Sequence, residues 1–280
     1  MTGPRHYAYR KDITDEEGVT IPYDWDWDQY LDAAVDLTVF EGDKVVRKGS
    51  STGNDMQEFY LMLYSGGGTL TKDGKAAFDG DEGIWALSWM VERNSYIAPQ
   101  GFSPLESSEI PYFALGKEVI AYAHPGVHAR NVERYAPEKL EFVTVPEPPL
   151  KAARVAMVNT DWLAIGKTTK HADAAWQFTA LHGATDALIE FNKDVGLLPP
   201  RKTAVENATY VKDSPVMAAV AKHLDLYGVP FPVYPEYTRL NNIIGPVLEA
   251  ASLKLKTPEE ALSEAAKEWN DILAANNWQS

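Results

Sequence analysis

Residues that could do covalent chemistry are scarce in this 280-residue sequence. It contains no cysteine, which excludes disulfides, thiolate nucleophiles and cysteine-ligated metals. There is no Gly-x-Ser-x-Gly motif, no dinucleotide-binding glycine fingerprint, and no Ser or Thr in the setting of an activated nucleophile. The sequence therefore carries no catalytic signature, which favours a binding protein over an enzyme.

Two short motifs resemble ligand sites but lack an essential residue. Gly166-Lys167-Thr168 ends like a phosphate loop, yet Asp161 stands where that loop needs its first glycine. His124 and His128 have the spacing of helical zinc ligands, but Pro125 and Gly126 lie between them and no Glu follows His124. We expect no bound metal and no cofactor.

Aromatic rings and carboxylates suit carbohydrate chemistry. A glycosidase needs two carboxylates that flank the scissile bond. Among 40 Asp and Glu residues no pair stands out, so a glycosidase remains a distant alternative. Most of the aromatic residues lie at helical spacing and belong to the core. Four aromatic residues instead lie near the ends of predicted elements, where α/β folds gather their ligand sites: Tyr64, Tyr122, Trp162 and Tyr237.

Charge excludes two classes of partner. The sequence has 26 Lys and Arg residues, so its formal net charge is −14. Such a chain is not expected to bind nucleic acid or an anionic membrane surface, because both require a basic patch. Hydrophobic residues make up 45% of the sequence, which is enough for a sizeable core. No apolar run approaches about 18 residues, and the first residues lack the apolar segment of a signal peptide.

Capping signals mark most of the expected helices. Asp26 and Gln29 have capping-box spacing, Asp79 and Glu82 have the same spacing, and Thr257 precedes a proline and two glutamates. We expect helices at about 26–42, 56–64, 79–91, 110–115, 172–181, 184–195, 215–228, 236–253 and 258–275. The expected strands are 119–123, 142–145 and 155–165, and the polar residues 43–54 are expected to form a loop.

Two proline-rich segments, 146–149 and 229–235, divide the chain into three blocks. The simplest arrangement is one discontinuous domain of residues 1–146 and 235–280, with residues 147–234 as a second unit. Few strands separated by helices indicate an α/β fold with a small sheet.

Six segments resemble the extracellular solute-binding proteins of ABC sugar importers (family 1). One contains the sequence Leu31-Asp32-Ala33-Ala34, and another contains Phe113-Ala-Leu-Gly-Lys117 before a strand. In the order of the family, the segments are 9–34, 65–79, 113–117, 162–178, 196–201 and 257–262.

The resemblance implies a periplasmic-binding-protein-like (type II) fold of two lobes, with a complete C-terminal lobe and a partial N-terminal lobe formed by residues 147–234. It implies a protein of the periplasm or cell surface that binds a carbohydrate between the lobes and delivers it to a membrane permease. Family members usually begin with a signal peptide and an α/β block that have no counterpart here. Residues 147–234 are therefore expected to expose apolar faces and to favour self-association or binding of a missing N-terminal segment. The alternative is a truncated fragment that no longer binds a solute and acts as an interaction protein.

Position within the resemblance selects the candidate ligand-binding residues. Asp161 is the favoured one, because a carboxylate inside an apolar strand is unfavourable without a partner. The full set is Asn54, Asp55, Tyr64, His124, Gly126, His128, Asp161, Trp162, Tyr237 and Arg239.

Overall fold

A computed structural model describes residues 2–52, 55–99, 105, 108–231 and 236–275. Its helices are α1 (Lys11–Glu17), α2 (Trp27–Asp36), α3 (Met56–Ser65), α4 (Asp81–Ile97), α5 (Pro125–Tyr135), α6 (Ala172–His182), α7 (Thr185–Val195), α8 (Lys202–Asn207), α9 (Thr209–Asp213), α10 (Pro215–Tyr227), α11 (Tyr237–Ser252) and α12 (Pro258–Ala275), with a 3-10 turn at Pro137–Phe142. Its strands are β1 (Thr2–Arg10), β2 (Val39–Glu41), β3 (Lys44–Ser50), β4 (Thr71–Lys72), β5 (Lys75–Ala76), β6 (Glu118–Ala123), β7 (Val143–Thr144), β8 (Ala156–Thr160) and β9 (Gly228–Pro230). No helix within these residues is long and apolar enough to cross a membrane.

Strand β1 is the central strand of the main sheet, whose order is β2-β3-β6-β1-β8-β9. Its first half pairs antiparallel with β8, from Thr2 to Arg5, and its second half pairs antiparallel with β6, from His6 to Tyr9. The flanking pairs β3–β6 and β8–β9 are parallel. Strand β1 therefore joins two groups of elements that are far apart in sequence.

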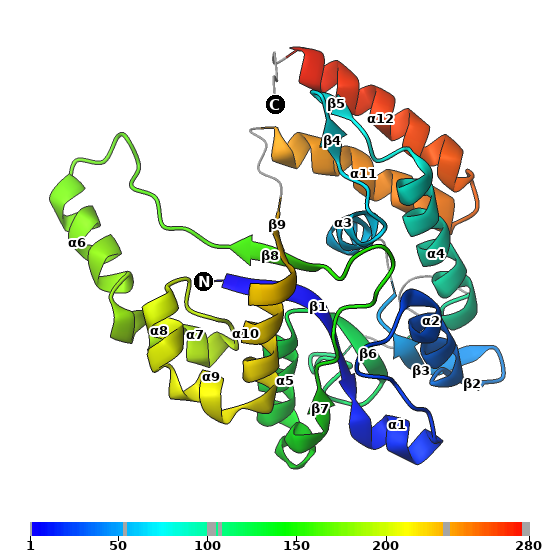
Figure 1. Cartoon of the computed structure of the whole chain (residues 1–280), viewed down its shortest axis with the longest axis horizontal. Helices are drawn as coiled ribbons and strands as arrows, with labels where there is room; N and C mark the ends of the chain where they lie inside the picture. The colour runs from blue at the N-terminus through cyan, green and yellow to red at the C-terminus, as the bar shows by residue number, and fades with distance from the viewer. Residues whose placement is uncertain (1, 53–54, 100–104, 106–107, 232–235, 276–280) are drawn as a thin grey trace.

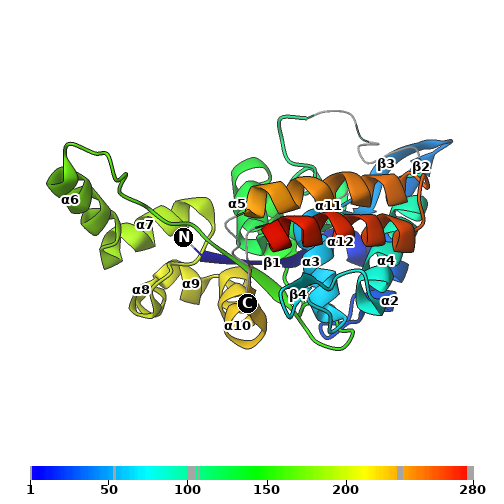
Figure 2. The same ribbon diagram turned by 90° about the horizontal axis from the view of Figure 1, so that it is seen from above.

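Helices cover the sheet in two groups (Figure 1). Helices α2, α3, α4, α11 and α12 pack over one apolar cluster, which includes Trp25, Trp27 and Trp269. Helices α5, α9 and α10 enclose a second, smaller cluster around Val132 and Val220. Helix α6 extends away from both groups, as Figure 2 shows from above.

Local helix signals in the sequence are confirmed where a side chain supplies the cap. Asp26 accepts hydrogen bonds from the Asp28 and Gln29 backbone N–H groups, and the Gln29 side chain accepts one from the Asp26 backbone N–H. Thr257 and Glu260 form the same reciprocal pair at α12, at 3.0 and 3.2 Å. The capping box predicted at Asp79 and Glu82 is wrong, because Gly80 is the N-cap of α4 and no side chain caps this helix.

Other sequence predictions fail where sheet neighbours decide the structure. The segment 43–54 was expected to be a loop, but it contains strand β3, which pairs with β6. An ion pair of 2.7 Å between Lys48 on β3 and Glu118 on β6 stabilises this polar strand. Strand β1 was not predicted. The expected strand 155–165 ends at Thr160, and 142–145 is a strand only at its centre. Residues 110–115 form turns rather than a helix.

A buried ion pair fixes α3 against α4 and β1. Glu58 Oε1 accepts hydrogen bonds from Arg93 Nη1 at 2.6 Å and from the Tyr7 hydroxyl at 2.7 Å. Both charged side chains are almost wholly excluded from solvent. The Arg93 guanidinium also lies over the Trp89 ring, 5.4 Å from its centroid. Because an unpaired buried charge is strongly unfavourable, these groups hold their three elements in one arrangement.

Removal of one member of this pair should destabilise the fold more than removal of both. Arg93→Met leaves the buried Glu58 carboxylate without its charged partner and should lower the free energy of unfolding by about 3–5 kcal/mol. The double variant Glu58→Met/Arg93→Met should lose less than Arg93→Met alone. Urea unfolding of both variants and the wild type measures the difference. Losses that simply add would contradict the coupling.

A second buried contact joins β1 to α10. His6 and His223 are fully buried, with 3.4 Å between His6 Nε2 and His223 Nδ1. His223 Nε2 lies 3.3 Å from the Tyr23 hydroxyl. Such an array accommodates neutral imidazoles, since two charged rings at this distance would repel each other.

Stability should therefore fall in mild acid. Burial lowers the pKa of His223 to about 4. The positive charges of Lys222 and Arg154 add to this effect, and the negative charge of Glu147 opposes it. Burial and the neighbouring His223 and His124 lower the pKa of His6 well below 6.5, its usual value. As the pH falls below 6.5, His6 and His223 become protonated in the unfolded chain but stay neutral in the folded chain. The free energy of unfolding should therefore decrease between pH 6.5 and 4.

The decrease should be smaller in His223→Gln than in the wild type, as measured by urea midpoints at pH 7.5, 6, 5 and 4. Equal slopes for the two proteins would show that this contact does not carry the pH dependence.

Candidate functional site

Polar side chains from β1, β8, α3 and α11 converge beside a hollow of about 550 Å³. Its wall includes Arg5, Asp55, Gln57, Asn241 and Asn242. These groups offer guanidinium and amide donors together with carboxylate and amide acceptors. Such a set matches a ligand with many hydroxyl groups.

Helix α3 brings Asp55 and Gln57 to the hollow. Asp55 Oδ1 accepts hydrogen bonds from the Gln57 and Glu58 backbone N–H groups at 2.7 and 3.3 Å, so Asp55 caps the helix. Gln57 Oε1 accepts a hydrogen bond of 3.3 Å from Asn159 on β8. The buried Glu58 follows directly, so the ion pair with Arg93 also fixes the start of α3.

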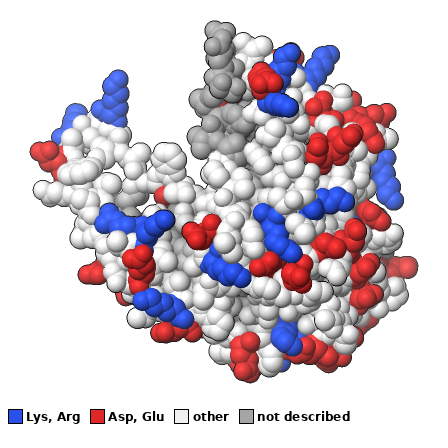
Figure 3. Space-filling model, viewed as in Figure 1, with Lys and Arg blue, Asp and Glu red and all other residues white. Residues whose placement is uncertain are grey.

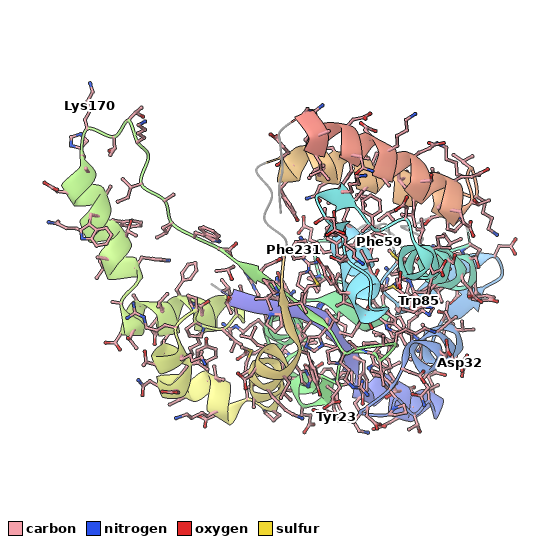
Figure 4. The ribbon with its side chains drawn as sticks, turned by 45° about the horizontal axis from the view of Figure 1, so that its top comes forward. Tyr23, Asp32, Phe59, Trp85, Lys170 and Phe231 are labelled. Carbon is pink, nitrogen blue, oxygen red and sulfur yellow. The ribbon has the colours of Figure 1, made fainter. Side chains whose placement is uncertain are left out.

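Helix α11 supplies the opposite wall. Asn241 is buried, and its Oδ1 accepts a hydrogen bond of 2.8 Å from the Tyr60 hydroxyl. Tyr237 lies one helical turn earlier on the same face. Its ring centroid lies 6.2 Å from that of Phe231, and the Phe231 centroid lies 5.6 Å from that of Tyr60. Figure 4 labels Phe231. Burial raises the pKa of Tyr237, which keeps its hydroxyl protonated.

Arg5 lies between these walls. Its guanidinium is 5.2 Å from the centroid of the Tyr122 ring, and Nη2 is 3.4 Å from Asp55 Oδ2. The Arg5 Nε and the Tyr122 hydroxyl are buried and make no hydrogen bond within the described residues. Arg5 therefore links Asp55, at the start of α3, to Tyr122 on β6.

Of the ten predicted residues, Asp55 lines the hollow, and Tyr237 lies beside it, near Asn241 and Arg5. Asn54 lies outside the described residues. Tyr64 is on α3 nine residues after Asp55, roughly 13 Å along the helix axis, and so away from the hollow. Arg239 is exposed on α11, one helical turn before Asn242, and is not among the residues that line the hollow.

The residues near α5 pack behind Arg5. The His124 Nδ1 is so close to Gly3 that a Cβ there would lie 2.6 Å from it, and the His128 ring lies 4.9 Å from that of Phe113. Burial lowers the pKa of both histidines to about 4, with Arg5 adding to the effect. Gly126 serves packing, because a Cβ would lie 2.1 Å from the Gly196 carbonyl oxygen. A ligand-binding role for these three remains a prediction.

Asp161 and Trp162 are exposed and lie beyond the end of β8. The argument that a buried strand carboxylate needs a partner therefore fails for Asp161, because this carboxylate is neither buried nor in a strand. Conversely, sequence reasoning missed Arg5, Gln57, Asn159 and Asn241. Gln57 follows Asp55 by two residues and Asn241 follows Tyr237 by one turn, so spacing could have indicated these two.

A larger hollow of about 730 Å³ lies between α5 and α10. Apolar side chains such as Val143, Val216 and Met217 line it, with Glu133 and Glu138 among its acidic residues. Its wall lacks the amides of the smaller hollow. Arg130, Lys193 and Tyr210 also line the larger hollow. The hollow at Asp55 is the candidate site because its amide groups can both donate and accept hydrogen bonds. Among the described residues, no group of three or more His, Asp or Glu side chains is placed to hold a metal.

Asp55 has a structural role that can be separated from ligand contact. Asp55→Ala removes the cap of α3 and should lower the free energy of unfolding by about 1 kcal/mol. Asp55→Ser keeps a capping oxygen and should remain within a few tenths of a kcal/mol of the wild type. Thermal or urea unfolding measures both changes. Equal losses in the two variants would show that capping is not the source.

Comparison with known proteins gives this geometry a context. Residues 2–237 match the model of a family described as bacterial extracellular solute-binding protein. An ABC transporter solute-binding protein from Thermotoga lettingae, bound with alpha-D-tagatose, has 22% sequence identity and a TM-score of 0.81, and the match covers 97% of this chain and 71% of that one. Maltose-bound MalE3 of T. maritima has 22% identity and a TM-score of 0.79, with 97% and 71% covered.

An ABC substrate-binding protein from Listeria monocytogenes, in complex with cycloalternan, has 20% identity and a TM-score of 0.80, with 98% and 70% covered. These likenesses confirm the predicted periplasmic-binding-protein-like α/β fold, and the chain spans about 70% of the length of the solved structures. The family match covers most of the chain. The chain therefore belongs to the family of bacterial extracellular solute-binding proteins.

Proposed function

We propose that this protein binds a carbohydrate at the hollow beside Asp55 and delivers it to the permease of an ABC importer. The observation that carries the proposal is the convergence of Arg5, Asp55, Gln57 and Asn241 on one hollow, next to the rings of Tyr237 and Phe231. Hydroxyl groups accept and donate to such side chains, and the C–H faces of a sugar stack on aromatic rings. The sugars bound by the solved structures support this ligand class.

The two-lobe division is part of the proposal. Residues 1–146 and 235–280 would form one lobe and 147–234 the other. The contact between Gln57 and Asn159 crosses this boundary at 3.3 Å, and the His6–His223 contact crosses it at 3.4 Å. A ligand that joins both sides would stabilise the closed arrangement. The proposal involves no chemical turnover, and it places the protein outside the cytoplasmic membrane, as is typical of its family.

The first experiment is a thermal-shift screen against mono-, di- and oligosaccharides and polyols. A ligand present at one hundred times its Kd should add about 2.7 kcal/mol to the free energy of unfolding. Aryl glycosides in the same panel test for hydrolysis. A flat response from a cooperatively folded sample would contradict carbohydrate binding and favour the alternative of a fragment that binds no solute.

Two substitutions locate the site once a ligand is known. Gln57→Ala removes a side chain from the wall of the hollow and should weaken binding at least tenfold, or about 1.4 kcal/mol. Glu268→Ala is the matched control, because Glu268 is exposed on α12 and does not line the hollow. Isothermal titration calorimetry compares the two. Equal weakening in both variants, or in neither, would place the ligand elsewhere.

A further inference from the structure

Helix α11 contains two adjacent residues that weaken helices, and both lie at the wall of the hollow beside Asp55. Gly245 and Pro246 stand in the middle of this 16-residue helix and line the hollow together with Asn241 and Asn242. Glycine and proline are the two least favourable residues in the interior of a helix. Local rules of this kind are broken mainly at functional sites, so the pair needs a reason at this wall.

Packing does not supply that reason at Gly245. A Cβ at this position would meet no atom of the described residues within 4 Å. The backbone of Gly245 also lacks the positive φ that requires glycine at other positions of the chain. In α4, by contrast, a Cβ at Gly83 would lie 1.7 Å from the Phe78 carbonyl oxygen. Gly245 therefore leaves room for a ligand ring to lie against the helix backbone.

Pro246 changes the hydrogen bonding of the same wall. In a regular α-helix the carbonyl of Asn242 would accept a hydrogen bond from the N–H of residue 246. Proline has no N–H, and its ring crowds the carbonyl four residues before it, so the Asn242 carbonyl oxygen loses its helical partner. Because Asn242 and Pro246 both line the hollow, this oxygen lies at the wall that a ligand would contact.

We propose that residues 242–246 select a neutral sugar. Gly245 makes room for the ring, and the Asn242 carbonyl oxygen accepts a hydrogen bond from one of its hydroxyl groups. The inference rests on the proposed function. A carbonyl oxygen can only accept, so the ligand must present a donor there, which a hydroxyl does and a carboxylate does not. Arg5, the cationic side chain of the lining, already faces Asp55 at 3.4 Å.

The charge of the chain favours the same class of ligand. The formal net charge is −14, and Figure 3 shows acidic side chains gathered over the side of the molecule that holds α2, α4 and α12. A field of this sign repels anionic ligands. A neutral sugar is therefore favoured over the uronic acid of the same shape.

Isothermal titration calorimetry of the full chain with matched ligands tests the substrate class. The probes are D-glucose, D-galactose and D-mannose, the three corresponding uronic acids, and the disaccharides maltose, cellobiose and lactose. We expect one of the neutral sugars to bind about tenfold more tightly, or better, than any of the uronic acids. A uronic acid that binds as tightly as the best neutral sugar would overturn the proposal.

Substitutions at Gly245 and Pro246 separate binding from stability, because the two effects have opposite signs. Gly245→Ala and Pro246→Ala each place a better helix former in α11, so each should raise the melting temperature. Both should weaken binding of the best neutral sugar. We expect a loss of about tenfold for Gly245→Ala, whose Cβ occupies the place of the ring, and of about fivefold for Pro246→Ala, which removes one hydrogen bond.

Glu249→Ala is the matched control. Glu249 is exposed on α11, one turn after Gly245, and is not among the residues that line the hollow. The substitution also introduces a good helix former, and it should leave the Kd at the wild-type value.

Two results at this wall would overturn the proposal. One is wild-type affinity in both Gly245→Ala and Pro246→Ala. The other is a loss of binding that comes with a lower melting temperature, which would show that these residues serve the fold. The proposed function is tested separately by the wild type. If no sugar binds it, the proposed function and this inference fail together, whereas a wild type that binds alongside variants that bind equally well refutes only the inference.

Discussion

The buried ion pair between Glu58 and Arg93 is the interaction on which the arrangement of the site depends. It joins α3 to α4, and the Tyr7 hydroxyl ties the same carboxylate to the central strand. Glu58 is the third residue of α3, directly after Gln57 and three residues after the cap Asp55. Water cannot reach either charged group, so neither can lose its partner without a large penalty. The ion pair therefore holds Asp55 and Gln57 at the hollow. A candidate binding residue on the surface is thus positioned by an ion pair in the core.

Strand β1 connects the candidate site to both groups of helices. One side chain, Arg5, enters the candidate site, whereas His6 contacts α10 and Tyr7 contacts α3. Neighbouring residues of a strand point to opposite faces, so three successive residues can serve both faces of the sheet. The two apolar clusters therefore meet at a strand that also carries a ligand-binding candidate.

Sequence reasoning succeeded where the cause of a structure is local. The caps at Asp26 and Thr257 and the proline-initiated helix after Ser214 depend on residues three or four positions apart, and all three are present. It failed where the cause is a neighbour distant in sequence. Strand β3 needs β6 beside it. Residues 161–165 have strand composition, but no strand among the described residues pairs with them. The same distinction holds for the site residues. Asp55 could be predicted from the polar loop in which it lies, whereas Arg5 and Asn159 come to the site only because their strands pair in the sheet.

The central claim is that a carbohydrate binds at the hollow beside Asp55. Hydrogen–deuterium exchange of the full chain, with and without a saturating oligosaccharide, tests it most directly because it locates the contact. The account predicts that residues 55–60 and 237–242 gain protection together, with the larger hollow between α5 and α10 unchanged. Protection confined to α5 and α10, or no change at 55–60 while ligand is demonstrably bound, would contradict it.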